Sequence, residues 1–453
     1  MNENKPDGAL HFPQGFLWGV GTSAYQVEGN SFNNQWYEFE KGGGIKTGDA
    51  CGMACNWWED AERDFDIAKS IGLNSLRLSV SWARIEPEEG LFDPEAVERY
   101  RQMLSALIFR SIRPIVCLHH FVHPLWFEKK GAFLSRNCVE DFARRVRFTV
   151  SELGDLCSDW ITFNEPNVYA LQGYLDGEYP PAMSGRLFKY FEVLGNMALC
   201  HAETYRIIHD LQPDARVSFA NHFIIFTEQE RQPFDRFAAR IAHASFNDVF
   251  IKMVAEGKAP LLSRLHGRLE QVKDTWDFIG VNIYGGVDVK FDITQAKYGF
   301  VRRIMPANRR TGDLDPEGNA MFGEIYPQGI KDVVEDLAKY NKPFFILENG
   351  VPDREDRLRP WVIATAVKTM HDLIQRGFNI LGYHHWTLVD NFEWALGYYM
   401  KFGLVEMEPV TQERKPRRSA EFYSEIIREN GLTADMVRKY VPQALPEIFP
   451  GLK

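Results

Sequence analysis

The chain has 453 residues and lacks any apolar stretch close to the roughly 20 residues that a membrane-spanning helix needs. Residues 1–10 carry no basic segment followed by an apolar run, so the sequence as written indicates no secretory signal. It also lacks a Lys/Arg-rich block, and 52 basic against 62 acidic side chains give a formal net charge of −10. We therefore expect neither nucleic acid nor a membrane surface as a partner, and the sequence leaves a homo-oligomer open.

Cysteine is sparse, and the six cysteines all lie in the first half of the chain. Cys51 and Cys55 are four positions apart, but no second pair of cysteines or histidines completes a zinc-binding pattern. We therefore expect no metal site. Buried or loop thiols of this kind are typical of a reducing compartment, which predicts a cytoplasmic protein.

No Gly/Ser-rich or Pro-rich linker and no low-complexity run divides the chain. We therefore expect one domain over residues 1–453, with residues 1–10 as a flexible N-terminal tail. What the sequence has in quantity is aromatic side chains, with 33 Phe, 17 Tyr and 11 Trp. Most of these should pack in the core of a domain large enough to bury them.

Eight short runs rich in β-branched and apolar residues alternate with longer segments of helical periodicity. The predicted strands are residues 16–21, 75–80, 114–119, 160–164, 217–221, 278–284, 344–347 and 380–386. The predicted helices are residues 57–71, 94–111, 138–156, 187–211, 234–256, 329–340 and 361–376. Strict alternation predicts parallel strands, which fit either a closed (β/α)8 barrel or a doubly wound open sheet.

The positions of polar residues favour the barrel. Four predicted strands end in, or run directly into, polar side chains, namely His119-His120, Asn164-Glu165, Asn282 to Tyr284, and Glu348-Asn349. In a barrel the C-terminal ends of the strands converge on one face, and active sites are built there. We therefore predict an α/β fold, a single-domain (β/α)8 TIM barrel with extended βα loops.

Two of these strand ends carry a carboxylate in similar surroundings. One apolar strand leads into Asn164, Glu165 and Pro166, and another leads into Glu348 and Asn349. Either glutamate alone would be interpreted as a solvated loop residue. A pair of them is more informative, because glycoside hydrolysis needs two carboxyl groups that face one bond.

Five sequence motifs in the same order resemble glycoside hydrolase family 1, the β-glucosidase and β-galactosidase family. They are residues 12–29 (FPQGFLWGVGTSAYQVEG), 77–85 (RLSVSWARI), 162–166 (TFNEP), 348–350 (ENG) and 390–395 (DNFEWA). The similarity runs from His11 to about Tyr423. It implies a retaining β-glycosidase, foremost a β-glucosidase that hydrolyses aryl or alkyl β-glucosides or short β-gluco-oligosaccharides. The substrate would be a small-molecule β-glycoside, and no metal or organic cofactor is expected because two carboxylates suffice.

Carried over position by position, the resemblance implies Glu165 as the acid/base and Glu348 as the nucleophile. In retaining enzymes two such groups lie about 5–5.5 Å apart. Arg77 and Tyr284 would hold Glu348 ionised, and the charge of Glu348 would keep Glu165 protonated. Asn164 would bind the 2-hydroxyl of the sugar, a contact that strengthens in the transition state.

The resemblance also implies a pocket for the sugar itself. Gln26 and Glu393 would bind hydroxyls on the far side of the ring, and Trp386 would lie against its apolar face. Such a pocket is selective because its buried polar groups lose their partners when the wrong sugar enters. The implied sugar-binding residues, with Asn282 in support behind them, are Gln26, His120, Asn164, Tyr284, Trp386, Glu393 and Trp394.

Several alternatives stay open within this resemblance. Gln26 and Glu393 can serve more than one sugar epimer, so a β-galactosidase, a β-fucosidase or a transglycosidase fits as well. A 6-phospho-β-glycosidase is less favoured, because Glu393 would repel phosphate and Met400 and Phe402 stand where such relatives carry Lys and Tyr. A non-catalytic sugar-binding relative would have lost a catalytic glutamate, whereas this sequence keeps both.

Overall fold

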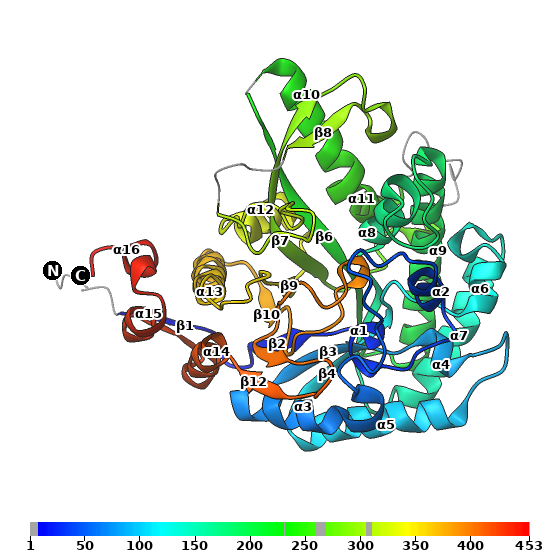
Figure 1. Ribbon diagram of the computed structural model, residues 1–453, viewed down its shortest axis with the longest axis horizontal. Coiled ribbons are helices and arrows are strands. Elements are labelled where there is room, and N and C mark those ends of the chain that lie inside the picture. Colours follow the sequence, from blue (N-terminus) through cyan, green and yellow to red (C-terminus); the bar gives the residue numbers. More distant parts are fainter. Residues whose placement is uncertain (1–7, 231, 259–268, 305–309, 453) are drawn as a thin grey trace.

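The computed structural model describes residues 8–230, 232–258, 269–304 and 310–452. In these ranges eight parallel strands form one closed ring, because β6 pairs with β5 on one side and with β7 on the other. The predicted TIM barrel is therefore confirmed (Figure 1). In order around the barrel, the strands are β2 (Leu17–Gly21), β3 (Ser75–Ser79), β4 (Arg113–His119), β5 (Asp159–Asn164), β6 (Arg216–Glu228), β7 (Ile279–Phe291), β9 (Phe344–Asn349) and β10 (Ile380–His385).

Helices follow the strands and cover the outside of the barrel. They are α3 (Trp57–Ile71), α5 (Pro94–Phe109), α7 (Cys138–Leu153), α9 (Leu187–Leu211), α10 (Pro233–Ala242) with α11 (Asp248–Glu256), α12 (Gly329–Leu337), α13 (Arg359–Gln375) and α14 (Arg418–Glu429). Helix α5 shows why these segments are helical. The Asp93 side chain accepts hydrogen bonds from two backbone N–H groups of its first turn, and Val97, Tyr100 and Leu104 bury one face at helical spacing.

The loops carry shorter elements. They are α1 (Ala24–Glu28), α2 (Gln35–Lys41), α4 (Trp82–Ile85), α6 (Leu125–Lys129), η1 (Ala132–Leu134), α8 (Pro166–Ala170), η2 (Leu171–Asp176), η4 (Glu270–Val272), η5 (Ala296–Tyr298), η6 (Ala338–Tyr340), η7 (Trp394–Leu396), β11 (Val405–Met407), β12 (Arg414–Pro416), α15 (Ala434–Tyr440), η8 (Pro442–Ala444) and α16 (Leu445–Ile448). Most of them lie in βα connections, as expected for extended βα loops.

The predicted helix 234–256 is wrong in one respect, because the structure divides it. A π-helical turn, η3 (His243–Asn247), separates α10 from α11. The turn directs the Asn247 side chain to β6, where its amide donates to the carbonyl of Ile224 at 2.8 Å and accepts from the N–H of the same residue at 3.1 Å. A helical pattern read from the sequence does not show this anchoring.

Strands β6 and β7 are longer than predicted and run past the rim of the barrel. Their outer halves, residues 224–228 and 286–291, pair with each other, and β8 (Val301–Ile304) adds an antiparallel strand. We call these three segments the β6–β8 arm; it projects at the top of Figure 1 beneath α10. A shift of register between Phe223 and Ile225 marks the point where barrel becomes arm.

The first described strand lies beside the C-terminal segment of the chain (Figure 1). Strand β1 (Ala9–His11) pairs antiparallel with β13 (Gly431–Thr433), so the predicted flexible tail does not hold for Ala9 and Leu10. Residues 1–7 of that predicted tail lie outside the described residues. Within the described ranges, every helix is too short or too polar to cross a membrane.

Candidate active site

The residues singled out from the sequence gather at the C-terminal ends of the barrel strands. Eight of them line one pocket, namely His120, Asn164, Glu165, Tyr284, Glu348, Trp386, Glu393 and Trp394. Three more do not line it but hold residues that do: Gln26, Arg77 and Asn282. The structure therefore brings the whole predicted set together.

Glu348 lies near the end of β9 and is buried. The buried guanidinium of Arg77, from β3, forms an ion pair with its Oε1, and the Tyr284 hydroxyl donates to its Oε2 at 2.5 Å. Burial nevertheless raises the pKa of Glu348 to about 7; Arg77 opposes this rise and nearby Glu165 adds to it. Arg77 and Tyr284 thus both stabilise the charged form of Glu348, as expected of its partners, while burial acts against them.

Glu165 follows β5 directly and stands at the N-terminus of α8. Its backbone lies in the left-handed region at φ 46°, and its N–H donates to the carbonyl of Ala220 at 2.8 Å. A non-glycine residue in that region is uncommon and often marks a functional position. Two side chains contact its Oε1: the Asn282 amide donates at 2.9 Å, and His222 Nδ1 lies 2.9 Å away.

Asn164 connects the two carboxyl groups. Its Oδ1 accepts hydrogen bonds from Arg77 at 2.7 Å and from Asn282 at 3.0 Å, the same two side chains that bond to Glu348 and Glu165. Its Nδ2 lies 3.0 Å from His120 Nε2. Burial lowers the pKa of His120 well below its ordinary value, so this imidazole is neutral and Nε2 accepts the bond. Within the described part of the chain no group partners His120 Nδ1, which can donate to a ligand.

Gln26 and Glu393 meet on the far side of the pocket. The Gln26 amide donates to Glu393 Oε2 at 3.2 Å and to the carbonyl of Phe392 at 3.0 Å, while Ser23 Oγ lies 2.7 Å from Gln26 Oε1. Burial, with a smaller contribution from the neighbouring Glu348 and Glu165, raises the pKa of Glu393 to about 8. These contacts fix both side chains before any ligand arrives.

Two tryptophans flank His120. Their rings stack on its imidazole, with centroids 6.0 Å away for Trp386 and 5.7 Å for Trp394, and both are about 3 % exposed. The last residue of the ENG motif, Gly350, lies against another part of the backbone. A Cβ at this position would lie 2.3 Å from the carbonyl oxygen of Trp386. The glycine is therefore needed for a close approach of two backbones.

Sequence reasoning missed several polar residues of this site, among them Gln172, Tyr179, His222 and Arg303 in the pocket wall and Asn391 behind it. His222 contacts Glu165, and it directly follows the predicted strand 217–221, the same kind of position that singled out Glu165. That signal could have found it. Asn391 accepts from the Gln26 amide at 3.1 Å. It belongs to the DNFEWA motif, but no local pattern in the sequence indicates its contact.

A group with metal-ligand chemistry lies apart from the pocket lining. Donor atoms of His243, Asp248 and Asp336 fall within 4.8 Å of one another. The ammonium group of Lys252 lies 2.6 Å from Asp248, and that of Lys339 lies 3.5 Å from Asp336. These cations already neutralise the carboxylates that a metal ion would use, so the group is better described as an ion-pair network.

A barrel that brings two buried carboxyl groups, a set of fixed hydrogen-bonding side chains and two tryptophans to one pocket defines a glycoside hydrolase. Comparison with known proteins supplies the family. The model described as glycosyl hydrolase family 1 matches residues 9–432, and the chain belongs to this family.

Three relatives illustrate the similarity. A 1,4-beta-D-glucan glucohydrolase of Thermotoga neapolitana is 30 % identical over 93 % of this chain and 99 % of its own length. The solved structure of a family 1 β-glucosidase from Thermotoga maritima matches with a TM-score of 0.86 and 30 % identity over 94 % of this chain and 99 % of that one. A β-glycosidase from Pyrococcus horikoshii matches with a TM-score of 0.84 and 32 % identity over 95 % and 98 %.

Proposed function

We propose that this glycosidase is a retaining β-glucosidase in which Glu348 is the nucleophile and Glu165 the acid/base. The observation that carries the proposal is the chain of hydrogen bonds between the two carboxyl groups. It runs from Glu348 through Arg77, Asn164 and Asn282 to Glu165, so both groups face one pocket from fixed positions. Retaining enzymes need such a pair at a separation of about 5–5.5 Å, which stays a prediction.

In the first step, ionised Glu348 attacks the anomeric carbon and the bond to the leaving oxygen breaks. Glu165 gives its proton to that oxygen, so the aglycone departs as a neutral alcohol and a glycosyl-enzyme ester remains. Glu348 must be ionised for this attack. Arg77 and Tyr284 stabilise its charge against the burial that raises its pKa to about 7, and a fraction of the free enzyme is therefore ready at neutral pH.

In the second step, Glu165, now a carboxylate, removes a proton from water. The hydroxide attacks the anomeric carbon from the face that the aglycone left, and Glu348 departs as a carboxylate. Two inversions give net retention. Asn282 and His222 contact the same oxygen of Glu165 and hold the group in place through both steps, which leaves Oε2 to exchange the proton.

The proposed sugar-binding roles are those that the family resemblance implies, and the fixed contacts support them. Asn164 would bind the 2-hydroxyl, where charge develops in the transition state. His120 would use its unpartnered Nδ1 for the 3-hydroxyl, and Gln26 and Glu393 would bind hydroxyls on the far side of the ring. Trp386 would lie against the apolar face of the sugar, with Trp394 and Tyr284 completing the wall and Asn282 in support.

Glucose is the first choice of sugar because two of the relatives described are named a glucohydrolase and a β-glucosidase. Galactose and fucose remain alternatives, since Gln26 and Glu393 can pair with either epimer, and transfer to an alcohol uses the same two carboxyls. Phosphorylated sugars are less favoured. Met400 and Phe402 are buried in an apolar cluster with Trp386 and offer no cation. Charge repulsion by Glu393 contributes less, because burial raises the pKa of this carboxyl group to about 8.

The proposal extends to the organisation and setting of the chain. One hydrophobic cluster contains residues from Leu10 to Phe449, which supports one domain. All six cysteines are buried free thiols, which supports a reducing, cytoplasmic location. A net charge of −10 speaks against nucleic acid and anionic membrane partners. The acid–base chemistry described above requires no cofactor.

A panel of 4-nitrophenyl β-D-glycosides tests the proposal. We expect the β-glucoside to have the highest kcat/KM, and the first sugar released to be the β-anomer by NMR. Release of the α-anomer would contradict retention. Turnover only of the 6-phosphoglucoside would favour the phospho-glycosidase, and no turnover of any member would favour a sugar-binding relative. The Glu348→Gln variant, which keeps the shape of the side chain, is the matched inactive control.

A further inference from the structure

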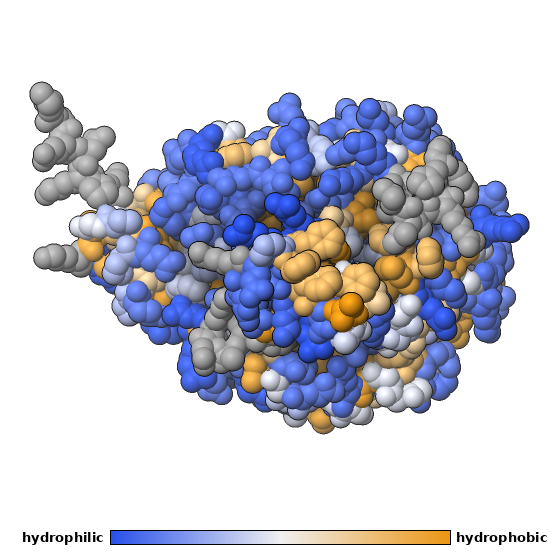
Figure 2. Space-filling view, turned by 90° about the horizontal axis from the view of Figure 1, so that it is seen from above, coloured by the Kyte–Doolittle hydropathy of each residue, from blue (hydrophilic) through white to orange (hydrophobic). Residues whose placement is uncertain are grey.

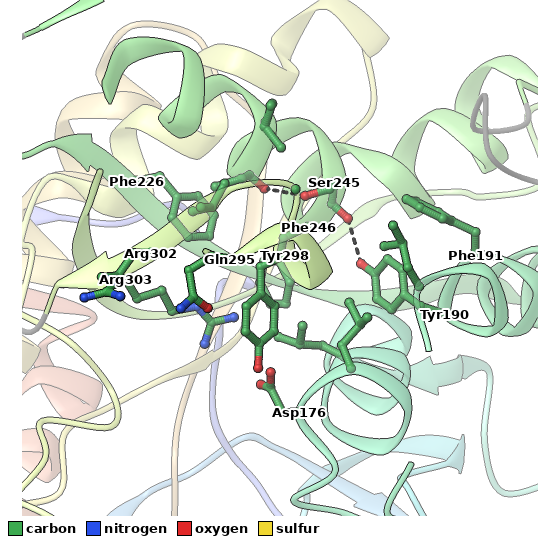
Figure 3. A pocket seen from close by; sticks show the side chains of 17 residues that line it. Asp176, Tyr190, Phe191, Phe226, Ser245, Phe246, Gln295, Tyr298, Arg302 and Arg303 are labelled. Atoms are coloured by element: carbon green, nitrogen blue, oxygen red, sulfur yellow. Dashed lines mark hydrogen bonds between the residues drawn. The ribbon is translucent and has the colours of Figure 1, made fainter. Parts of the chain in front are cut away.

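A second cavity of about 380 Å³ lies beside the catalytic pocket. It is enclosed by η2, the beginning of α9, η3, η5 and the β6–β8 arm (Figure 3). Its size falls within the range of about 300–1,000 Å³ that is typical of small-molecule sites. Nothing in the proposed sugar chemistry uses it.

The lining of this cavity is mainly apolar, although Gln295, Arg302 and Arg303 also contribute to it. Figure 3 shows Phe226, Phe246, Tyr298 and Tyr190 around it, and leucines of η2 and α9 complete the wall. Two pairs of polar groups in the wall bond to each other. The Tyr190 hydroxyl donates to the carbonyl of Ser245 at 2.7 Å, and the Tyr298 hydroxyl faces the Asp176 carboxylate. A second sugar would therefore find few partners for its hydroxyls here.

The cavity adjoins the catalytic pocket on the side of the acid/base. Leu171, Phe246 and Arg303 line both spaces. Contacts between side chains connect Glu165 with the cavity wall. His222 contacts Glu165, its ring centroid lies 5.8 Å from that of Phe246, and the Phe246 ring lies 6.2 Å from that of Phe226. Because the acid/base protonates the leaving oxygen, the aglycone of a bound glycoside begins at Glu165, next to this shared wall.

Apolar side chains also continue outward from the cavity. Phe234, Phe237 and Ile293 are 66 %, 53 % and 75 % exposed, and the Phe234 ring contacts Phe291 of β7 at 5.6 Å. Figure 2, which views the molecule from the side of α10 and the arm, shows a hydrophobic patch among hydrophilic surface. Single exposed apolar residues are ordinary, whereas a hydrophobic patch on the surface is a common mark of a binding region.

We propose that this cavity binds the hydrocarbon tail of an amphiphilic β-glycoside, so that the preferred aglycone is a linear alkyl alcohol rather than a second sugar. The inference rests on the proposed β-glucosidase function and names its substrate class. The sugar occupies the catalytic pocket, with the glycosidic oxygen at Glu165. The alkyl chain extends past Phe246 and is buried in the space between η2 and the β6–β8 arm.

The test is a series of n-alkyl β-D-glucosides from ethyl to octyl, used below their critical micelle concentrations. In the wild-type enzyme kcat/KM should rise by about fourfold for each methylene group that becomes fully buried, and then level off. Cellobiose should be a poorer substrate than octyl glucoside. Hydrolysis of 4-nitrophenyl β-D-glucoside reports the basal activity throughout.

Two variants probe the cavity without touching the catalytic groups. Leu187→Asn places a polar side chain in its wall at a half-buried position, and Ala242→Phe fills its space from α10. Each should lower kcat/KM for octyl glucoside at least about tenfold and leave the aryl glucoside unchanged. Leu211→Asn is the matched control, because it makes the same change at the opposite, exposed end of α9 and should alter neither substrate.

The outcomes separate the two proposals. Hydrolysis of the aryl glucoside with no dependence on alkyl length overturns the tail site and leaves the β-glucosidase function standing. A dependence on length that both cavity variants retain places the tail elsewhere and also overturns it. If Ala242→Phe fails to fold, Leu187→Asn decides alone. Failure to hydrolyse any β-glucoside overturns the proposed function, and the tail site falls with it.

Discussion

His222 and Asn282 are directly paired across strands β6 and β7, and both contact Oε1 of Glu165 at 2.9 Å. Asn282 is in turn paired with Glu348 across β7 and β9. Glu348 and the two side chains that contact Glu165 thus lie in one lateral row over three strands of the barrel wall. Strand pairing therefore helps to set the geometry of the proposed chemistry.

The proposed nucleophile can be identified by chemical rescue. Glu348→Ala should lower kcat by about 10⁴-fold or more, because the attacking group is lost. Sodium azide should restore turnover with an activated aryl glucoside and give the α-glycosyl azide, since azide attacks from the face that Glu348 occupied. The anomeric configuration is measured by NMR. A β-glycosyl azide would show that another group is the nucleophile.

The proposed acid can be identified from the leaving group. Glu165→Ala should lower kcat/KM by about 10²–10⁴-fold for alkyl glucosides, whose leaving oxygen needs a proton. It should have a much smaller effect on 2,4-dinitrophenyl β-glucoside, whose leaving group departs unprotonated. Rates across a series of leaving groups measure the difference. An equal loss for all of them would contradict a role in proton donation.

His222 should act through Glu165 and not on the sugar. His222→Ala should lower kcat/KM on the order of tenfold for alkyl glucosides and less for the dinitrophenyl substrate, because the acid loses a contact that fixes its position. His222→Asn, whose amide can donate from a similar place, should recover most of the loss. If His222 had a purely structural role, His222→Ala would lower kcat/KM equally for both substrates, and His222→Asn would not restore it.

We expect Tyr284 to influence the pH dependence of kcat/KM. Its hydroxyl lowers the pKa of Glu348 against burial, which raises that pKa to about 7. Tyr284→Phe removes this hydrogen bond, so the pKa rises further and the acid limb of kcat/KM should move to higher pH by about one unit. Tyr205→Phe is the control, because its hydroxyl bonds to Asp277 away from the pocket. An unchanged acid limb in Tyr284→Phe would contradict the assignment of that limb to Glu348.

Glu393 should make the folded state less stable as pH rises. Burial raises its pKa to about 8 in the folded state, whereas an unfolded Glu has about 4.3, so between these values the folded state binds the extra proton. The free energy of unfolding should therefore fall with rising pH, by up to about 1.4 kcal/mol per pH unit, between about pH 5 and 8. Urea unfolding at several pH values should show a flatter dependence in Glu393→Gln. The surface variant Glu406→Gln should keep the wild-type slope.

The sequence predicts the barrel and most of the site because both depend on local signals. Alternation of strands and helices is a local pattern, and Glu165 and Glu348 stand where an apolar run stops. The outer halves of β6 and β7 were missed because they exist through pairing with each other and with β8. Polar residues such as His222 and Asn282 look like the ends of strands, although the chain continues through them as sheet.

Other features depend on contacts that no local pattern records. The π turn at Asn247 exists because its amide bonds to Ile224 of another element. The protonation state of Glu348 depends on how burial, Arg77 and Glu165 balance in three dimensions. The sequence identifies the groups involved, but the direction of the net shift in the pKa of Glu348 can be found only from the packed structure.

The shift of register between Phe223 and Ile225 divides β6 into a part within the barrel and a part within the β6–β8 arm. Residues on the barrel side hold the catalytic groups, and residues on the arm side shape the wall against which an aglycone would rest. Substitutions beyond this boundary can therefore diversify the accepted alcohols while the reaction centre stays intact. For directed evolution, residues 224–228 and 286–291 are the segments to randomise first.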